Sequence, residues 1–264
     1  MRNSELIFSA VAISAIVGVG VGAASAADMP AKAYTKAPPL VTMYDWSGFY
    51  IGLNGGGGSS GKCWDLTNNL GTIFNPPLPE GCHNATGGTV GGQVGYRWQS
   101  QAWVFGVEAQ GNWANFTGSG SNATFLVTDH SKIDSFGMFT GQVGYAFNNV
   151  LLYLKGGAAV THDKYFTVST DPLFGLGLVA DTASETRWGG VVGVGAEFGF
   201  APNWSIAFEY DHMFMGTRDV NAYGVGNIIL GAGVFSATDR IRQDVDVGTV
   251  RLNYRWGTPV VAKY

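Results

Sequence analysis

The stretch WGGVVGVGAEFGFAPNWSIAFEY, residues 188–210, shows most clearly how this chain folds. Every second residue from Trp188 to Phe200 is apolar or glycine, whereas the positions between them are mostly glycine, with a charge at Glu197. After Ala-Pro-Asn at 201–203 the same alternation resumes from Trp204. A period of two, interrupted by a cluster of turn residues, predicts a β-hairpin with one apolar face and one polar face.

The chain contains eight segments with this alternation, with ends uncertain by a few residues. They cover roughly residues 46–57, 86–98, 103–114, 134–147, 150–161, 187–200, 204–213 and 245–256. One face of these segments carries no charge. It consists of Phe49, Ile51, Leu53, Val90, Gly92, Val94, Tyr96, Trp98, Trp103, Phe105, Val107, Ala109, Trp113, Phe139, Val143, Tyr145, Phe147, Val150, Leu152, Leu154, Ala158, Val160, Trp188, Val192, Val194, Ala196, Phe198, Phe200, Trp204, Ile206, Phe208, Tyr210, Val250, Leu252, Tyr254 and Trp256. A Lys or Arg at the midplane of a lipid-facing strand costs about 2–4 kcal/mol, so this face suits contact with hydrocarbon.

The opposite face is rich in glycine and carries a few charges of both signs. Its polar side chains are Gln93, Arg97, Glu108, Gln110, Asn112, Thr140, Gln142, Lys155, Glu197, Glu209, Arg251, Asn253 and Arg255. Phe136, Met138, Leu151 and Val191 depart from this polarity, mostly near segment ends. A soluble sandwich or lipocalin would turn the apolar face inward, and alternation alone does not decide between the two arrangements. The sparse charge and the aromatic segment ends favour a membrane barrel with a polar interior.

The composition also points to a membrane barrel. Charged residues make up 13% of the 264 residues, against about 25% in ordinary domains. Glycine is abundant, at 40 residues, and the net charge is −4, which argues against a nucleic-acid-binding protein. Beyond the first thirty residues no run reaches the ~18 consecutive apolar residues of a membrane helix. A chain of this kind can therefore span a bilayer only as a closed barrel.

The first residues show the three parts of a secretory signal peptide. Arg2 gives a positive start, residues 6–22 are apolar, and Ala-Ser-Ala provides a small-residue cleavage site. We therefore expect a signal peptide over 1–26, a flexible periplasmic leader over 27–45 and one barrel over 46–264. A helical anchor is the alternative, which three glycines in the apolar run disfavour.

Three connections between the segments are short, and an aromatic residue stands on at least one side of each, with Phe147 and Val150 flanking the connection at 148–149. Trp98 and Trp103 flank one, and Phe200 and Trp204 flank another. Such turns fit the periplasmic side of the membrane, with the aromatic rings at the lipid–water interface. The other connections are rich in Gly, Asn, Ser and Thr, and we expect them to be extracellular loops. They cover about 58–85, 115–133, 162–186 and 214–244.

Several pieces of the chain, in this order and spacing, resemble a known family. They are WSGFYIGLN at 46–54, LYLKGGAA at 152–159, Asn203-Trp204-Ser205 leading to Glu209-Tyr210, and NYRW at 253–256. Together they resemble the small outer-membrane β-barrel proteins of alphaproteobacteria, the porin-like surface-antigen and hemin-binding group. The resemblance covers essentially the whole chain. It implies an eight-stranded barrel of the OmpA/OmpX type, and a role in envelope integrity, surface antigenicity or, as in some members, hemin binding.

The interior of an eight-stranded barrel is a space that side chains roughly fill. Counted from the periplasmic end of each segment, several polar residues lie five positions along: Gln93, Glu108, Gln142, Lys155, Glu209 and Arg251. We predict an interior polar network formed by Arg97, Glu108, Lys155, Glu197, Glu209, Arg251 and Arg255. The hypothesis is that paired charges hold the barrel shut. The alternative is a looser, hydrated interior without defined pairs.

Cys63 and Cys82 are the only two cysteines, and both fall in the first predicted outer loop. Export to an oxidising compartment favours a disulfide between them, with a metal or redox pair as the alternative.

The four histidines fall in or beside the predicted outer loops and show no metal-ligand or heme-ligand spacing. They are His83, His130, His162 and His212. A membrane enzyme would need a general base held near one rim of the barrel. No histidine lies in the middle of a predicted strand, where it could be held in this way. We therefore expect no cofactor, no metal site and no enzymatic activity.

These observations predict a non-enzymatic barrel of the bacterial outer membrane that displays loops outward. A small-solute porin and a protein that binds hemin or a host ligand through its loops are the alternatives. The expected partners are outer-membrane lipid and, during assembly, the barrel-insertion machinery, and nucleic acid is not expected. That machinery reads a final strand with a terminal aromatic residue, and both Trp256 and Tyr264 are candidates for it.

Overall fold

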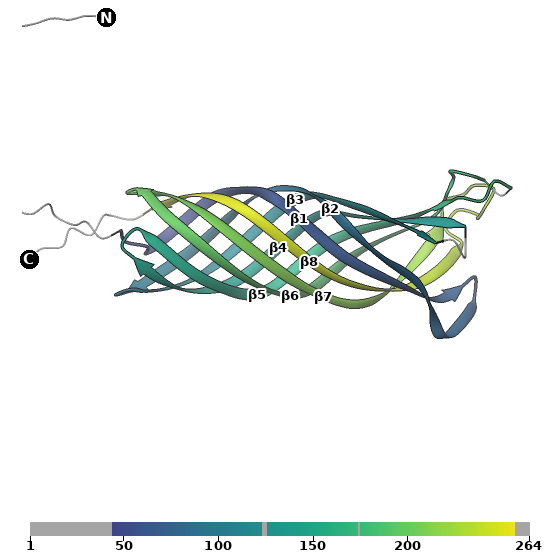
Figure 1. Cartoon of the computed structure of the whole chain (residues 1–264), viewed down its shortest axis with the longest axis horizontal. Coiled ribbons are helices and arrows are strands. Elements are labelled where there is room, and N and C mark those ends of the chain that lie inside the picture. Colours follow the sequence, from purple (N-terminus) through teal and green to yellow (C-terminus); the bar gives the residue numbers. More distant parts are fainter. Residues whose placement is uncertain (1–43, 123–125, 174, 257–264) are drawn as a thin grey trace, which may run out of the picture. The chain divides into compact units, whose positions relative to one another are not determined.

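The computed structural model describes residues 44–122, 126–173 and 175–256, which form a closed antiparallel β-barrel (Figure 1). Its strands are β1 (Gly48–Asn69), β2 (Thr72–Ser100), β3 (Trp103–Asn122), β4 (Val127–Phe147), β5 (Val150–Ser169), β6 (Val179–Ala201), β7 (Trp204–Gly224) and β8 (Phe235–Trp256). Each strand pairs with the next one in sequence, and β8 pairs with β1. The predicted eight-stranded up-and-down barrel is confirmed.

The register of the ring shows which end of the barrel holds the short turns. Phe49 of β1 lies opposite Tyr96 of β2 and opposite Trp256 of β8, so β1 begins where β8 ends. Turns at 101–102, 148–149 and 202–203 close the same end. We call this the proximal end, and the opposite one the distal end.

The outward side chains form an apolar band bounded by aromatic rings. On β3 the band runs from Trp103 to Trp113, and on β7 from Trp204 to Phe214, so its two ends are ten positions apart in each case. Along strands tilted by about 45° this spans roughly 23 Å, close to the ~25 Å of a membrane barrel. Most of the large apolar side chains of the predicted uncharged face are exposed in this band, which we call the membrane band. No helix in the described part of the chain is long and apolar enough to cross a bilayer.

The strands continue well beyond the membrane band at the distal end, and this contradicts the four long loops predicted from the sequence. Most of 58–85, 115–133, 162–186 and 214–244 is strand, and only residues 70–71 separate β1 from β2. Outside lipid, the outer face of a strand no longer has to be apolar. The alternation that identifies strands therefore fades while the backbone pairing continues. We call this part of the barrel the distal extension.

The proximal end is closed by the residues just before β1. Trp46 is only 1% exposed, and its backbone N–H donates to Gln99 Oε1 at 2.7 Å. The ring of Tyr44 lies against Gly199, with the guanidinium of Arg255 5.2 Å from its centroid. The predicted signal peptide, the leader before Tyr44 and the residues after 256 lie outside the described residues.

Candidate functional site in the barrel interior

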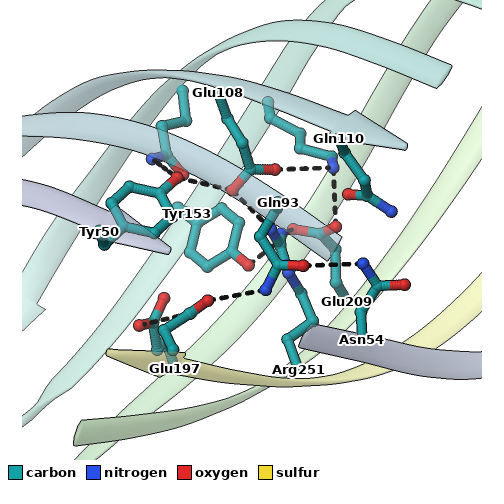
Figure 2. Close-up of polar contacts among 12 residues, drawn as sticks. Tyr50, Asn54, Gln93, Glu108, Gln110, Tyr153, Glu197, Glu209 and Arg251 are labelled. Carbon is teal, nitrogen blue, oxygen red and sulfur yellow. Dashed lines mark hydrogen bonds and ion pairs between the residues drawn. The ribbon is translucent and has the colours of Figure 1, made fainter. Parts of the chain in front are cut away.

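Four charged side chains meet inside the barrel at mid-height of the membrane band. Lys155 Nζ (β5) lies 2.7 Å from Glu209 Oε1 (β7) and 3.8 Å from Glu108 Oε1 (β3). Arg251 Nη2 (β8) lies 2.5 Å from Glu108 Oε2, and Arg251 Nη1 contacts Glu209. Figure 2 shows Arg251 reaching toward these two carboxylates. The side chains are at most 2% exposed, so each charge depends on its partners rather than on water.

Three further side chains that the sequence analysis missed complete this group. Tyr50 Oη donates to Glu108 Oε2 at 2.6 Å, and Tyr153 Oη donates to a Glu209 oxygen at 2.7 Å. Asp211 Oδ1 lies 3.2 Å from Lys155 Nζ. All three occupy inward positions of their strands, so their place in the alternation was the available signal. Tyr50 and Tyr153 are aromatic rather than charged, so charge on the inward face did not indicate them.

The remaining predicted network residues lie nearer the proximal end. Arg97 Nη2 is 2.8 Å from Glu197 Oε2, and its guanidinium carbon lies 4.4 Å from the ring centroid of Tyr50. Arg255 instead donates to backbone oxygens, those of Ser47 at 2.8 Å and Pro202 at 3.1 Å. The structure thus divides the predicted residues into a central group, a separate ion pair and a clamp on the proximal turns.

A chain of amide side chains runs around the inner wall and ends on the carboxylate of the Arg97–Glu197 pair. Asn112 donates to Asn54 at 2.6 Å, Asn54 to Gln93 at 2.7 Å, and Gln93 to Asn253 Oδ1 at 2.7 Å. Asn253 then donates to Glu197 Oε1 at 3.0 Å. The chain joins β3, β1, β2, β8 and β6, and Figure 2 shows part of it. Such a connected network favours one fixed arrangement of its members.

An apolar plug lies on the distal side of this polar layer. It consists of Ala85, Phe116, Ile133, Phe136, Met138, Ala159, Val191, Met213, Met215, Val245 and Val247, all buried in one cluster. Phe136, Met138 and Val191 departed from the predicted polarity, and the structure gives the reason. They face inward and belong to one buried cluster, so these departures from the polar pattern are explained by internal packing.

A second buried charge group lies within the distal extension. Lys62 Nζ of β1 is 2.7 Å from Asp163 Oδ1 of β5, and both side chains are fully buried. Thr161 and Gln243 also donate to Asp163, at 2.6 and 3.4 Å. Arg187 of β6, likewise buried, contacts Glu185 at 3.1 Å. None of these residues was predicted to be in the network, because the segments that carry them were expected to be loops.

Carboxylates collect at the distal mouth, outside the membrane band. Glu80 accepts from Asn122 at 3.2 Å, and Asp129 accepts from Thr167 at 3.2 Å. Burial raises the pKa of Asp129 to about 6. Burial, together with the neighbouring carboxylates, also raises the pKa values of Glu80 and Asp239. This mouth therefore holds fewer charges near neutral pH than its carboxyl groups suggest.

The predicted cysteine pair is bonded in the structure. Cys63 and Cys82 lie directly opposite in the β1–β2 ladder and form a disulfide. The pair lies in the distal extension and ties the β1–β2 hairpin together.

The four histidines occupy separate places and have separate partners. His83 contacts Ser131, His130 stacks on Phe166, His162 contacts Thr186, and His212 contacts Asp246. Within the described residues, no three His, Cys, Asp or Glu side chains are grouped to hold a metal ion.

Comparison with known proteins agrees with this architecture. The family model described as outer membrane protein beta-barrel domain matches residues 14–256. The 31 kDa outer-membrane immunogenic protein of Brucella melitensis is 30% identical over 239 residues, covering 88% of this chain and 96% of that one. Outer membrane protein P1 of Coxiella burnetii is 28% identical over 193 residues, covering 69% and 73%.

Among solved structures, the outer membrane protein OprG of Pseudomonas aeruginosa superposes with a TM-score of 0.51 at 14% identity. The match covers 80% of this chain and 97% of OprG, and it speaks for the fold alone. The family match and the Brucella relative place the protein in the bacterial outer membrane. The chain belongs to the outer membrane protein beta-barrel domain family.

Proposed function

We propose that this protein is a closed, non-conducting and non-enzymatic component of the outer membrane that carries its distal extension into the medium. The observation that carries the proposal is the filling of the interior along its length. A proximal cluster around Trp46 and Leu151, the charge group at Lys155, the plug around Phe116 and the group at Lys62 follow one another along the barrel.

The layers leave little room for solute inside the distal extension. A hollow bounded by Trp64, Tyr165 and Ile241 holds only about 10 Å³, at or below the ~10–15 Å³ that one water needs. A conducting pore needs a continuous hydrated path, and the apolar plug interrupts any such path. These features favour a structural barrel over a small-solute porin.

Two features resemble parts of an enzyme but do not assemble one. Ser131 lies 2.8 Å from His83 Nε2, yet Ser131 is only 2% exposed. The stretch at 57–61, GGSSG, matches the spacing of a nucleophile elbow, but it lies inside β1 rather than at a strand-to-helix turn. Neither feature presents an accessible nucleophile beside a base, which supports the non-enzymatic function.

Planar-bilayer recording of the refolded mature chain tests the closed-barrel function. We expect no steady single-channel conductance, with a general porin run in parallel as the positive control. Steady, reproducible openings of the wild-type protein would instead favour the porin alternative. Heat-modifiable electrophoresis first confirms that the protein is folded, so that the absence of conductance cannot be due to an unfolded chain.

The distal tips support a second role, contact with a partner outside the cell. Leu173 and Ile228 are 85% and 83% exposed there. The two tips that carry them are neighbours, because a Cβ on Gly175 would contact Ile229. Exposed apolar side chains that gather in one place are typical of an interaction site. The Brucella relative is named as immunogenic, which fits an exposed distal extension. Protease added to intact cells should cut the chain at these tips. If the tips stay uncut on intact cells, they are not exposed and the role is excluded.

Titration of the refolded protein with hemin tests the hemin-binding alternative. An unchanged hemin absorption spectrum would exclude hemin binding.

A further inference from the structure

The outer wall of the distal extension carries a groove over β6. It encloses about 720 Å³. β6 contributes short hydroxyl side chains to its floor, while longer side chains from β5 and β7 stand on either side. We call it the β6 groove, and its outward-facing lining is Lys164, Phe166, Thr182, Ser184, Asn221 and Tyr223.

The β6–β7 ladder is interrupted beside the groove. Thr182 pairs with Tyr223, and Gly190 pairs with Phe214, but within the described strands no ladder pair joins 183–189 to β7. Gly216 adopts a left-handed φ of 69° nearby and is followed by exposed residues, as at a bulge. Backbone N–H and C=O groups left by a ladder need other partners. The open seam therefore offers polar backbone groups, beside the hydroxyls, to anything that fills the groove.

One side of the groove carries surplus positive charge. Lys164 lies opposite Lys132 in the β4–β5 ladder, and both ammonium groups contact the single carboxylate of Asp134, at 2.5 and 3.0 Å. Two cations sharing one anion leave a net positive charge. The Lys164 side chain is 54% exposed, so it can reach a further anion. A lysine ammonium is a point charge well suited to phosphate.

Each side of the groove also carries an aromatic ring, Phe166 on β5 and Tyr223 on β7. Tyr223 is 45% exposed, and Phe166 is half-buried with His130 stacked on it at 4.6 Å between centroids. Aromatic faces accept the apolar C–H face of a sugar ring, while hydroxyl and amide side chains accept and donate to its hydroxyl groups. Rings, hydroxyls, an amide and one cation together fit a sugar that carries an anionic group.

The height of the groove indicates where such a sugar comes from. Trp188 is the outermost aromatic residue of the membrane band on β6, and Ser184 lies four residues beyond it. Along a tilted strand this is roughly 9 Å above the hydrocarbon. Lipid headgroups lie at this level, and the groove is on the outer wall, facing neighbouring lipid rather than the medium above. We propose that the β6 groove binds the anionic sugar headgroup of an outer-leaflet glycolipid, with Lys164 contacting its phosphate or carboxylate.

Native mass spectrometry of the refolded protein in a neutral detergent tests this proposal with deep-rough lipopolysaccharide as the probe. Lys164→Gln removes the cation, and Ser184→Tyr fills the groove from an exposed position. Arg242→Gln is the matched control. Arg242 is an exposed cation on β8, away from the groove, and lies fourteen positions from the proximal end of its strand, as Lys164 does on β5. Heat-modifiable electrophoresis confirms that every variant is folded.

We expect Lys164→Gln to weaken glycolipid binding at least fivefold, Ser184→Tyr to remove it, and Arg242→Gln to change it less than twofold. Dephosphorylated glycolipid should bind the wild type as weakly as intact glycolipid binds Lys164→Gln. The proposal is overturned if both groove variants bind like the wild type, or if Arg242→Gln causes an equal loss, since charge alone would then explain the binding. A free sugar phosphate that binds as tightly as the glycolipid would overturn the assignment to a lipid source.

Discussion

Replacement of Lys155 by methionine is the sharpest test of how the membrane band is held together. Methionine keeps much of the length of the side chain and removes only the charge. It leaves three carboxylates, those of Glu108, Glu209 and Asp211, with Arg251 as their remaining cation. Breaking one side of a buried pair costs about 3–5 kcal/mol, because the uncompensated charges stay out of water. This corresponds to a loss of roughly two to nearly four orders of magnitude in the folding equilibrium.

Urea unfolding of the refolded barrel in lipid vesicles, followed by tryptophan fluorescence, measures this loss. The double variant Lys155→Met/Asp211→Asn should recover part of it, because Lys155 is the ion-pair partner of Asp211 in the structure. Lys132→Met is the control, since Lys132 is 42% exposed and its ion pair is a surface one. If Lys155→Met unfolds within about 1 kcal/mol of the wild type, the interior is hydrated and the reasoning from burial fails.

Three further predictions concern the plug and the distal extension. Phe116→Ala, at a fully buried position of the plug, should cost about 3–5 kcal/mol in the same unfolding assay. Cys63→Ser/Cys82→Ser should speed proteolysis of the β1–β2 hairpin, since the bridge is worth ~3 kcal/mol in the chain-entropy model, and should leave the heat-modified migration of the barrel unchanged. The pKa of Asp129 is raised by burial to about 6, and that of Asp239 is also raised. A raised carboxyl pKa means that the folded state holds the proton more tightly. The stabilisation at Asp129 is therefore full below about pH 4 and is lost as pH rises through about 6. The stabilisation at Asp239 is lost at higher pH, because its pKa is raised to about 9. The distal loops should therefore resist proteolysis better at pH 5 than at pH 8, and Asp129→Asn should reduce that difference, whereas an unchanged difference would contradict it.

The central charge group was predictable because the position of a residue along its strand fixes its depth in the barrel, and the alternation fixes whether its side chain points inward. Counting from the proximal turns placed Glu108, Lys155, Glu209 and Arg251 at one height, and the structure brings these four into contact. The count says nothing about distance across the barrel. Arg255 was included in the predicted network as a charged residue of the polar face, outside this count, and in the structure it donates to backbone carbonyls at the proximal end.

The distal extension was the part that sequence patterns missed. The strands were predicted from alternating apolar residues. A strand needs an apolar outer face only where it contacts lipid, so the alternation ends with the membrane band. Lys62 and Asp163 therefore looked like loop residues, although both are fully buried in the barrel. Phe136 and Met138 looked like exceptions to the rule, whereas they form part of the apolar plug.

The number of strands, their antiparallel order, the face that meets lipid and the depth of the central charges could all be predicted from the amino-acid sequence. These follow from the period of two and from the cost of placing charge in hydrocarbon, both of which are local properties of the chain. The tertiary structure alone decided which charges pair, how far the strands extend, that an apolar plug crosses the interior and where the β6–β7 seam opens. Each of these depends on side chains from strands far apart in sequence meeting across a closed ring, and no local pattern records such distances.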